Sequence, residues 1–177
     1  MPRIHILGAS GSGTTTLAAS VAQILGIAHF DSDFFYWLPT DPPFTEPRPV
    51  AERLALMQAE IPAEGSWVLS GSAIRWATPY EKLYDLIVYL RLDLTVRMAR
   101  LRRREHERYG ARIAPGGDME EATAAFLDWA AAYDTAGPEL RSRAAHEAWL
   151  ADQAAKVLRL DSASPVAELT AAVLGAV

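Results

Sequence analysis

Residues 8–16, with the sequence GASGSGTTT, constrain the fold of this chain more than any other segment. They follow a short apolar stretch at residues 4–7 that predicts a buried strand. They lead into residues 14–25, where apolar side chains recur every four positions and predict an amphipathic helix. Glycines let the backbone curl so that successive N–H groups converge on phosphate oxygens, and a helix N-terminus adds partial positive charge. The segment therefore predicts a phosphate-binding loop rather than an ordinary strand-to-helix turn.

The composition excludes several classes of protein. The 177 residues predict a single domain, and the net charge of −5 gives no basic footprint for nucleic acid. The absence of cysteine excludes a disulfide scaffold, a thiolate zinc site and a catalytic thiol. No apolar run is long enough to span a membrane, so we expect a cytoplasmic protein. Of the 17 basic residues only Lys82 and Lys156 are lysines, and the simplest explanation for the many arginines is genome composition.

Short apolar stretches alternate with longer helical patterns along the whole chain. Further strands are predicted at residues 28–31, 67–69, 86–90 and 157–160. Further helices are predicted at residues 51–61, from Asp93 onward, near 119–133 and 138–153, and after Pro165. Five prolines make residues 38–50 a loop. This alternation predicts an α/β fold, a three-layer sandwich with helices on both faces of a five-stranded, mostly parallel sheet.

The glycine segment resembles the P-loop pattern G-x-x-x-x-G-K-[ST] of nucleotide-binding proteins. Gly8 and Gly13 match the two framing glycines, and Thr15 falls where the family has its magnesium-binding hydroxyl. The resemblance implies that ATP and Mg²⁺ bind here. The residues expected to contact the nucleotide are Gly8, Ala9, Ser10, Gly11, Ser12, Gly13, Thr14, Thr15 and Thr16.

Thr14 departs from this pattern because it occupies the position of the P-loop lysine. In that family the lysine neutralises the β- and γ-phosphates during transfer, whereas threonine contributes a hydrogen bond and no charge. Either an arginine from elsewhere replaces it, or phosphoryl transfer is slow or absent. Lys82 stays open as a substitute, although nothing in the sequence places it near the loop.

Two aspartates, Asp31 and Asp33, follow the second predicted strand. They resemble the Asp-x-Asp of shikimate- and gluconate-type kinases. The resemblance implies that Asp31 holds Mg²⁺ together with Thr15, and that Asp33 orients or deprotonates the acceptor hydroxyl. The plainer interpretation is a solvated turn with a capping aspartate. Tyr36 is a candidate to stack on a substrate ring, and Phe34, like Phe35, is expected in the core.

The third predicted strand ends in Ser70 and Gly71, where adenylate-kinase-like proteins often have Asp-Gly. The magnesium-related role of that aspartate is therefore lost or passes to Asp31. Arg75 resembles the arginine with which that family grips an acceptor phosphate. A lone surface arginine is the equally weighted alternative.

Residues 97–112 carry seven arginines directly after the fourth predicted strand. A solvated helix face is the usual interpretation of such a run. In nucleotide kinases, however, a lid in this place closes arginines over the phosphates. Arg100, Arg104, Arg108 and Arg112 recur every four residues and share a face if the helix persists. By this resemblance Arg100 binds the nucleotide and Arg104 and Arg112 are catalytic, with hinge freedom at residues 116–117.

The segment 126–133, followed by Arg141 and Arg143, resembles the C-terminal half of adenylate-kinase-like topology modulation proteins. The resemblance runs from residue 4 to about 160 and implies the strand order 2-3-1-4-5. It also implies one domain, residues 1–177. Its core is residues 1–92 and 156–177, and its lid or helical region is about 100–153. Arg141 then binds substrate, and residues 161–165 line the adenine pocket.

The leading hypothesis is an ATP-dependent kinase whose acceptor is a nucleotide or another small molecule, without nucleic-acid or membrane partners. The replaced lysine motivates an alternative, a catalytically degenerate nucleotide-binding switch or sensor. A third hypothesis is an NAD(P)-binding module that uses Gly8, Gly11 and Gly13 for the pyrophosphate and Asp31 for the ribose. The sequence identifies neither the acceptor nor the oligomeric state.

Overall fold

The five apolar stretches form the parallel strands of one sheet in a computed structural model that describes residues 2–177. The sheet order is β2-β3-β1-β4-β5, as expected, so the predicted fold class is confirmed. Central β1 pairs with β3 on one side, with Ile4 opposite Val68, and with β4 on the other. The strands are β1 (Arg3–Gly8), β2 (Ala28–Asp31), β3 (Trp67–Ser70), β4 (Leu86–Arg91) and β5 (Lys156–Asp161).

This strand order rejects the NAD(P)-binding hypothesis. In dinucleotide-binding folds the first strand lies beside the second, with the order 3-2-1-4-5-6. Here β3 lies between β1 and β2, because residues 67–70 pair with both of them. The first crossover therefore skips one strand position, and β2 becomes an edge of the sheet.

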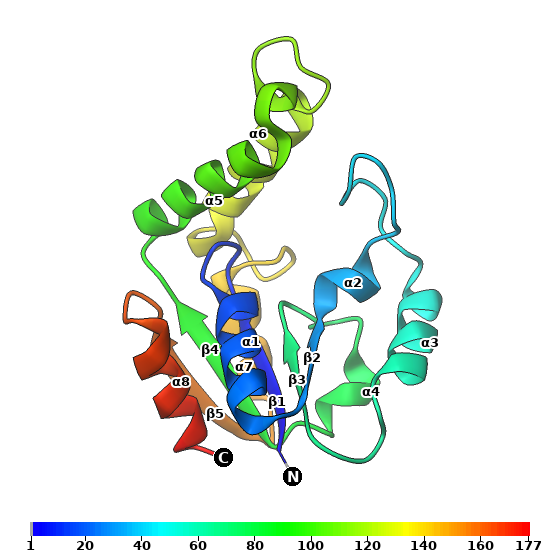
Figure 1. Cartoon of the computed structure of the whole chain (residues 1–177), viewed down its shortest axis with the longest axis vertical. Coiled ribbons are helices and arrows are strands. Elements are labelled where there is room, and N and C mark those ends of the chain that lie inside the picture. The colour runs from blue at the N-terminus through cyan, green and yellow to red at the C-terminus, as the bar shows by residue number, and fades with distance from the viewer. Residues whose placement is uncertain (1) are drawn as a thin grey trace.

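Helices cover both faces of the sheet and make three layers (Figure 1). On one face α1 (Thr14–Leu25) and α8 (Val166–Leu174) bury Leu17 and Val173 against β1, β3 and β4. On the other face α3 (Val50–Glu60), α4 (Thr78–Glu81) and α7 (Arg143–Ala151) contribute Met57, Tyr80 and Leu150 to a second apolar cluster.

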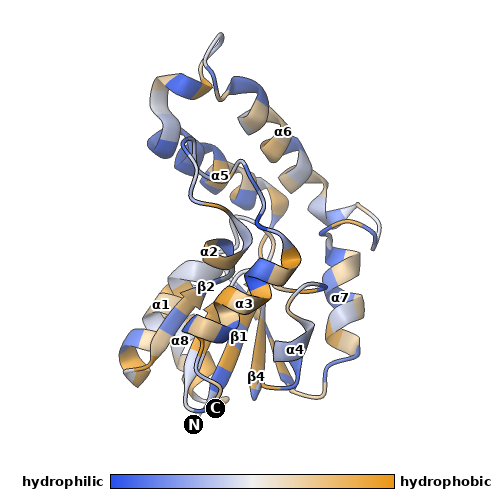
Figure 2. Cartoon of the chain, turned by 90° about the vertical axis from the view of Figure 1, so that its right-hand side faces the viewer, coloured by the Kyte–Doolittle hydropathy of each residue, from blue (hydrophilic) through white to orange (hydrophobic). Residues whose placement is uncertain are grey.

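The arginine-rich helix α5 (Leu94–Tyr109) and helix α6 (Glu120–Ala131) rise above the sheet as an upper lobe (Figure 1). Asp93 caps α5 as predicted, since its carboxylate accepts a hydrogen bond from Thr95 N at 2.8 Å. Arg97 is buried and its guanidinium donates to the carbonyls of Leu92 and Ala130, which fastens α5 to α6. Most of α5 is hydrophilic, in contrast to the apolar strands (Figure 2).

The structure differs from the sequence-based expectations at several places. The helix expected at 138–153 begins only at Arg143, because Ser142 Oγ accepts from Ala145 N and forms the cap there. The short helix α2 (Ser32–Tyr36) was not anticipated. It points Phe35 into the core and leaves Phe34 58% exposed, so the expectation of a buried Phe34 is wrong. Within residues 2–177, no helix combines the length and apolar character of a transmembrane span.

Candidate functional site

Residues 8–16, the predicted phosphate loop, connect β1 to α1. The geometry of this loop requires glycine at positions 8 and 13. Gly13 has φ +91°, a left-handed conformation that side chains with a Cβ rarely adopt. A Cβ on Gly8 would lie 2.6 Å from Ser12 Oγ and 2.7 Å from the carbonyl oxygen of Leu90. The loop therefore packs against β4 while its backbone reverses direction at the start of α1.

The N-terminus of α1 carries N–H groups without helical acceptors. The first bond of the helix runs from Leu17 N to the Gly13 carbonyl, so the N–H groups of Thr14, Thr15 and Thr16 have no partner within α1. Gly13, the capping residue, offers no side chain, and the first turn contains no acidic residue. The partial positive charge of the helix end is thus open to an anion from the cavity.

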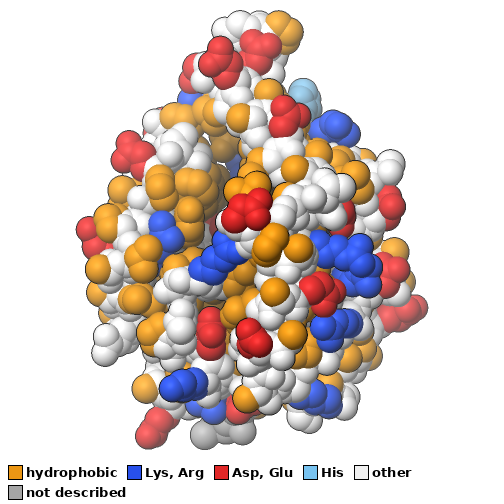
Figure 3. Space-filling view, turned by 180° about the vertical axis from the view of Figure 1, so that it is seen from behind, with side chains coloured by type: hydrophobic (Ala, Val, Ile, Leu, Met, Phe, Trp, Pro, Cys, Tyr) orange, Lys and Arg blue, Asp and Glu red, His pale blue; other side chains and the backbone are white. Residues whose placement is uncertain are grey.

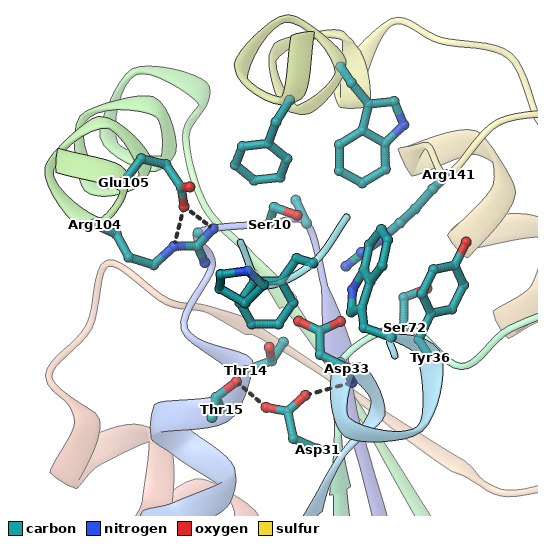
Figure 4. Close-up of a pocket in the computed structure, with 18 of the residues that line it drawn as sticks. Ser10, Thr14, Thr15, Asp31, Asp33, Tyr36, Ser72, Arg104, Glu105 and Arg141 are labelled. Atoms are coloured by element: carbon teal, nitrogen blue, oxygen red, sulfur yellow. Dashed lines mark hydrogen bonds and ion pairs between the residues drawn. The ribbon is translucent and has the colours of Figure 1, made fainter. Parts of the chain in front are cut away.

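Thr15 and the two aspartates meet in front of this helix end (Figure 4). Thr15 Oγ1 donates to Asp31 Oδ2 at 2.8 Å, and the Asp33 N–H donates to the other Asp31 oxygen at 3.0 Å. Asp31 therefore caps α2, as one of the two interpretations predicted, and still presents a carboxylate to the phosphate loop.

The Thr15 and Asp31 pair fits one part of a Mg²⁺ site. Mg²⁺ takes oxygen ligands and usually combines one or two carboxylates with substrate phosphates and water. Among residues 2–177 no group of three or more acidic or histidine side chains could hold a metal ion alone. Phosphate oxygens would have to supply the remaining ligands.

The Asp33 carboxyl opens onto the cavity above Asp31 (Figure 4). Part of its side chain is exposed, but desolvation in the cleft, together with the charge of Asp31, raises the pKa of Asp33. Arg141, Arg104 and Arg108 act in the opposite direction. A carboxyl with a raised pKa holds a proton more readily, which suits a group that accepts one from a hydroxyl.

Arg141 brings a guanidinium to the phosphate loop from the segment before α7. Its Nη2 donates to the Gly8 carbonyl at 3.2 Å, and its Nε is buried without a partner among the described residues. Desolvation lowers the pKa of Arg141, against the opposing charge of Asp33. Arg141 also lies over the ring of Trp129, 5.6 Å from its centroid. A cation therefore stands beside the loop that lacks its lysine.

The arginines expected in a lid do not all lie near the loop. Arg100 and Arg104 line the space around the loop, and a Cβ on Gly13 would lie 3.9 Å from Arg100 Nη1. Arg104 is held by Glu105, with 2.8 Å between Nη2 and the carboxylate (Figure 4). Arg112 does not continue this face, because α5 ends at Tyr109, and its guanidinium pairs with Asp118 at 2.7 Å. Arg112 lines neither of the cavities described next.

Two adjoining cavities meet at the phosphate loop, in the hollow beneath the upper lobe (Figure 3). The first, of about 970 Å³, is lined by Asp33, Tyr36, Ser72, Arg75 and Arg141 among others. The second, of about 1010 Å³, is lined by loop residues with Arg100, Ser162 and Ser164. The 161–165 segment, expected at an adenine pocket, thus borders the second cavity. We call the first the acceptor cavity and the second the nucleotide cavity, after the roles that the sequence led us to expect for their residues.

The remaining sequence candidates lie as follows. Arg75 borders the acceptor cavity, and its Nη1 donates to the Glu139 carbonyl at 2.7 Å. Ser70 is fully buried and bonds to His29 Nε2 at 2.9 Å, so its hydroxyl does not reach the cavity. Lys82 is exposed after α4, and Lys156 Nζ donates to the Ala176 carbonyl. Neither lysine lines a cavity, so neither replaces the missing one.

A chain of buried polar side chains, which the sequence did not reveal, ends at the acceptor cavity. Tyr89 and Tyr133 join their hydroxyls at 2.9 Å, and Tyr133 reaches His146 Nδ1 at 2.7 Å. His146 Nε2 then lies 2.9 Å from Ser72 Oγ. Burial, assisted by the charge of Arg141, lowers the pKa of His146 to about 3, so its ring is neutral at physiological pH. These partners come from four separate segments, and no local motif signals them.

Sheet order, phosphate loop and solved structures together define the class of fold. A gluconokinase from Sinorhizobium meliloti 1021 matches 98% of this chain and 90% of its own, with 16% identity and a TM-score of 0.54. An unliganded sugar kinase from Janibacter sp. HTCC2649 matches 99% of this chain and 93% of its own, with 18% identity and a TM-score of 0.54. The chain has the fold of the P-loop kinases.

Sequence comparison places the chain more narrowly. It is 42% identical over 165 residues to the uncharacterized protein YqaC of Bacillus subtilis (strain 168), which covers 93% of this chain and 91% of that protein. The chain therefore belongs to the YqaC family. No family model matches it.

Proposed function

We propose that this protein binds ATP with Mg²⁺ and transfers the γ-phosphoryl group to a nucleotide or another small molecule. One observation carries the proposal. At the open N-terminus of α1, directly after the glycine loop, Thr15 is hydrogen-bonded to Asp31. Free N–H groups, a hydroxyl and a carboxylate at one point are the chemistry that a nucleotide phosphate chain with its metal requires.

The proposed division of labour follows the placement of the side chains. The N–H groups of residues 9–15 would hold the phosphates, and Thr15 with Asp31 would hold Mg²⁺. When bound, Mg²⁺ neutralises charge on the phosphate oxygens. When the accepting group is a hydroxyl, Asp33 accepts its proton as the hydroxyl oxygen bonds to the γ-phosphorus. The bond to the β-phosphate oxygen breaks with its electron pair, and ADP leaves.

We further propose that Arg141 supplies the cation that Thr14 does not. Its contact with Gly8 and its unpartnered Nε place donors at the loop. Arg100 and Arg104 approach from above when residues 100–153 close as a lid over a core of residues 1–92 and 156–177. Arg112 joins them only if closure breaks its ion pair with Asp118. Arg75 and Tyr36 bind the acceptor.

A nucleotide switch or sensor that lacks catalysis is the second candidate. Thr14 in the lysine position and Ser70 in the place of an acidic residue favour it. Thr14→Lys separates the two functions. A large gain in ATP turnover marks the natural protein as impaired in transfer, whereas a loss marks Thr14 as adapted to the chemistry.

Calorimetry tests nucleotide binding directly. We expect heat with ATP that increases on addition of Mg²⁺, and we expect Thr15→Val to remove the increase while leaving binding without metal nearly unchanged. Thr135→Ala, a similar change at an exposed position away from both cavities, serves as the control. Absence of heat and of a thermal shift with ATP, ADP and GTP refutes the proposal.

A further inference from the structure

Aromatic rings from separate segments form two walls of the acceptor cavity. The lower wall consists of Tyr36 and Trp37, at the end of α2, and Trp76, which follows β3. The upper wall consists of Phe126 and Trp129 on α6. Three of the five tryptophans of the chain therefore border this one cavity.

The lower wall is held in place by a buried cation. Arg53 is 8% exposed, and its guanidinium carbon lies 3.8 Å from the centroid of the Tyr36 ring and 5.5 Å from that of Trp76. The Tyr36 ring also lies 4.8 Å from Trp37, edge to face. Such contacts fix the ring planes before a ligand arrives, which lowers the entropic cost of binding.

The upper wall leaves large apolar surface uncovered. Phe126 and Trp129 are three residues apart on α6, so their side chains share a face, with 6.0 Å between ring centroids. Trp129 is 38% exposed, whereas Phe126 is half-buried and packs against a small apolar cluster between α5 and α6. The guanidinium carbon of Arg104 lies 5.7 Å from the centroid of the Phe126 ring, and that of Arg141 lies 5.6 Å from the centroid of Trp129. Partly exposed rings with cations beside them are suited to a flat ligand that carries negative charge.

The hydrogen-bonded chain described above makes Ser72 a donor toward the cavity. Tyr89 is 1% exposed, and Tyr133 is the one partner of its hydroxyl among the described residues, so Tyr89 donates. Tyr133 then donates to His146 Nδ1, and neutral His146 carries its hydrogen on Nε2 and donates to Ser72. The Ser72 hydrogen is left to point into the cavity. The reverse direction would leave the buried Tyr89 hydrogen without an acceptor, which is costly.

We propose that the acceptor is an anion with a flat, unsaturated ring: the ring lies between the two aromatic walls, and Ser72 and Arg75 bind its phosphate or carboxylate. That this anion accepts a phosphoryl group rests on the proposed function, whereas its binding in this cavity does not. Nucleoside monophosphates and aromatic hydroxy acids share this chemistry. The ring-free sugar acids do not.

Matched ligand pairs test the proposal by tryptophan fluorescence and calorimetry, in the presence of saturating Mg²⁺ and a non-hydrolysable ATP analogue. The pairs are nucleoside monophosphates against ribose 5-phosphate, and hydroxybenzoate against hydroxycyclohexanecarboxylate, with gluconate as a further ring-free anion. We expect at least one ring-bearing anion to bind about 5- to 100-fold more tightly than its ring-free partner. Whichever pair binds identifies the source of the ring.

Variants separate the ring from the charge. Trp129→Leu should lower the affinity for the ring-bearing anion about fivefold or more, while Trp129→Phe should retain most of that affinity. Ile24→Ala, at a side chain 62% exposed outside both cavities, should change nothing. Ser72→Ala should weaken the anion about tenfold but leave the uncharged nucleoside unaffected, and Ser72→Thr should restore binding.

Four outcomes overturn the proposal. They are equal affinity for ring-free anions, equal affinity for the neutral nucleoside, binding of the ring-bearing anion only when the ATP analogue is left out, and no binding of any ring-bearing anion. In the last case, a fluorescence change with the ATP analogue alone would mean that the two walls pack against each other on closure. Failure of the proposed function has a different signature, because ring-bearing anions would then bind although ATP does not.

Discussion

Replacing Arg141 by methionine should separate nucleotide affinity from stability. The guanidinium is confined near the phosphate loop, makes one protein hydrogen bond at 3.2 Å, and keeps a buried N–H unpartnered among the described residues. Burial also lowers its pKa, which means that the folded state holds the charged form less favourably than water does. Methionine keeps the unbranched apolar stem of the side chain and removes the charge and the donors.

The magnitudes favour opposite effects on the two properties. Loss of the bond to Gly8 costs about 0.5–1.5 kcal/mol, whereas removal of the unpartnered N–H returns about 1–3 kcal/mol. The free energy of unfolding should therefore stay within about 1 kcal/mol of the natural protein or increase. A hydrogen bond to a charged phosphate is worth about 1.5–3 kcal/mol, so ATP should bind about 10- to 150-fold more weakly.

Calorimetric titration with MgATP and denaturant unfolding measure the two effects. Arg141→Lys is the matched control, because it keeps the charge but not the forked donors, and its affinity should lie between the other two proteins. A loss of about 3 kcal/mol in unfolding free energy with unchanged ATP affinity would mean that Arg141 holds the fold together. That result would refute its assignment to the phosphates.

Three further predictions follow from the buried and titrating groups. Tyr133→Phe leaves both the Tyr89 hydroxyl and His146 Nδ1 without partners, so it should lower the unfolding free energy by about 1–2 kcal/mol more than Tyr89→Phe does. Denaturant unfolding measures both losses, and equal losses would contradict the hydrogen-bonded series from Tyr89 to His146. Because the pKa of Asp33 is raised, turnover should rise with pH, and the midpoint of that rise should lie above the pKa of an ordinary aspartate. Asp33→Asn should abolish turnover and should stabilise the fold at pH 7, because the ionised Asp33 carboxylate is disfavoured there. Burial lowers the pKa of His5 to about 4 and that of His146 to about 3, from 6.5 in the unfolded chain. The folded state therefore binds fewer protons than the unfolded state. As the pH drops below 6.5 toward these values, the free energy of unfolding should fall by about 1.4 kcal/mol per pH unit for each histidine. Unfolding measured at pH 7 and pH 5 checks this, and an unchanged free energy would show that both rings become protonated in the fold.

The local parts of the site could be predicted from the sequence because neighbouring residues create them. The glycine loop lies between a strand and a helix, and Asp31 ends its strand, so both reach the carboxyl edge of the sheet together. Because both segments lie at that edge, Thr15 comes within 2.8 Å of Asp31. Periodicity and loop lengths likewise predicted the five strands.

Contacts between distant segments could not be predicted. Arg141 meets Gly8 across 133 positions, and His146 meets Ser72 across 74, so only the packed fold brings them together. Spacing alone also misplaced Arg112, because four-residue periodicity holds only while the helix lasts and α5 ends at Tyr109.

A crystal structure with Mg²⁺ and a non-hydrolysable ATP analogue tests the central claim most directly. We expect the phosphate chain along the N–H groups of residues 9–15, the metal beside Thr15 and Asp31, and the guanidinium of Arg141 within hydrogen-bond distance of a phosphate oxygen. A phosphate chain outside the loop would contradict the claim. So would a chain in the loop that no arginine meets while Arg141 stays on the Gly8 carbonyl.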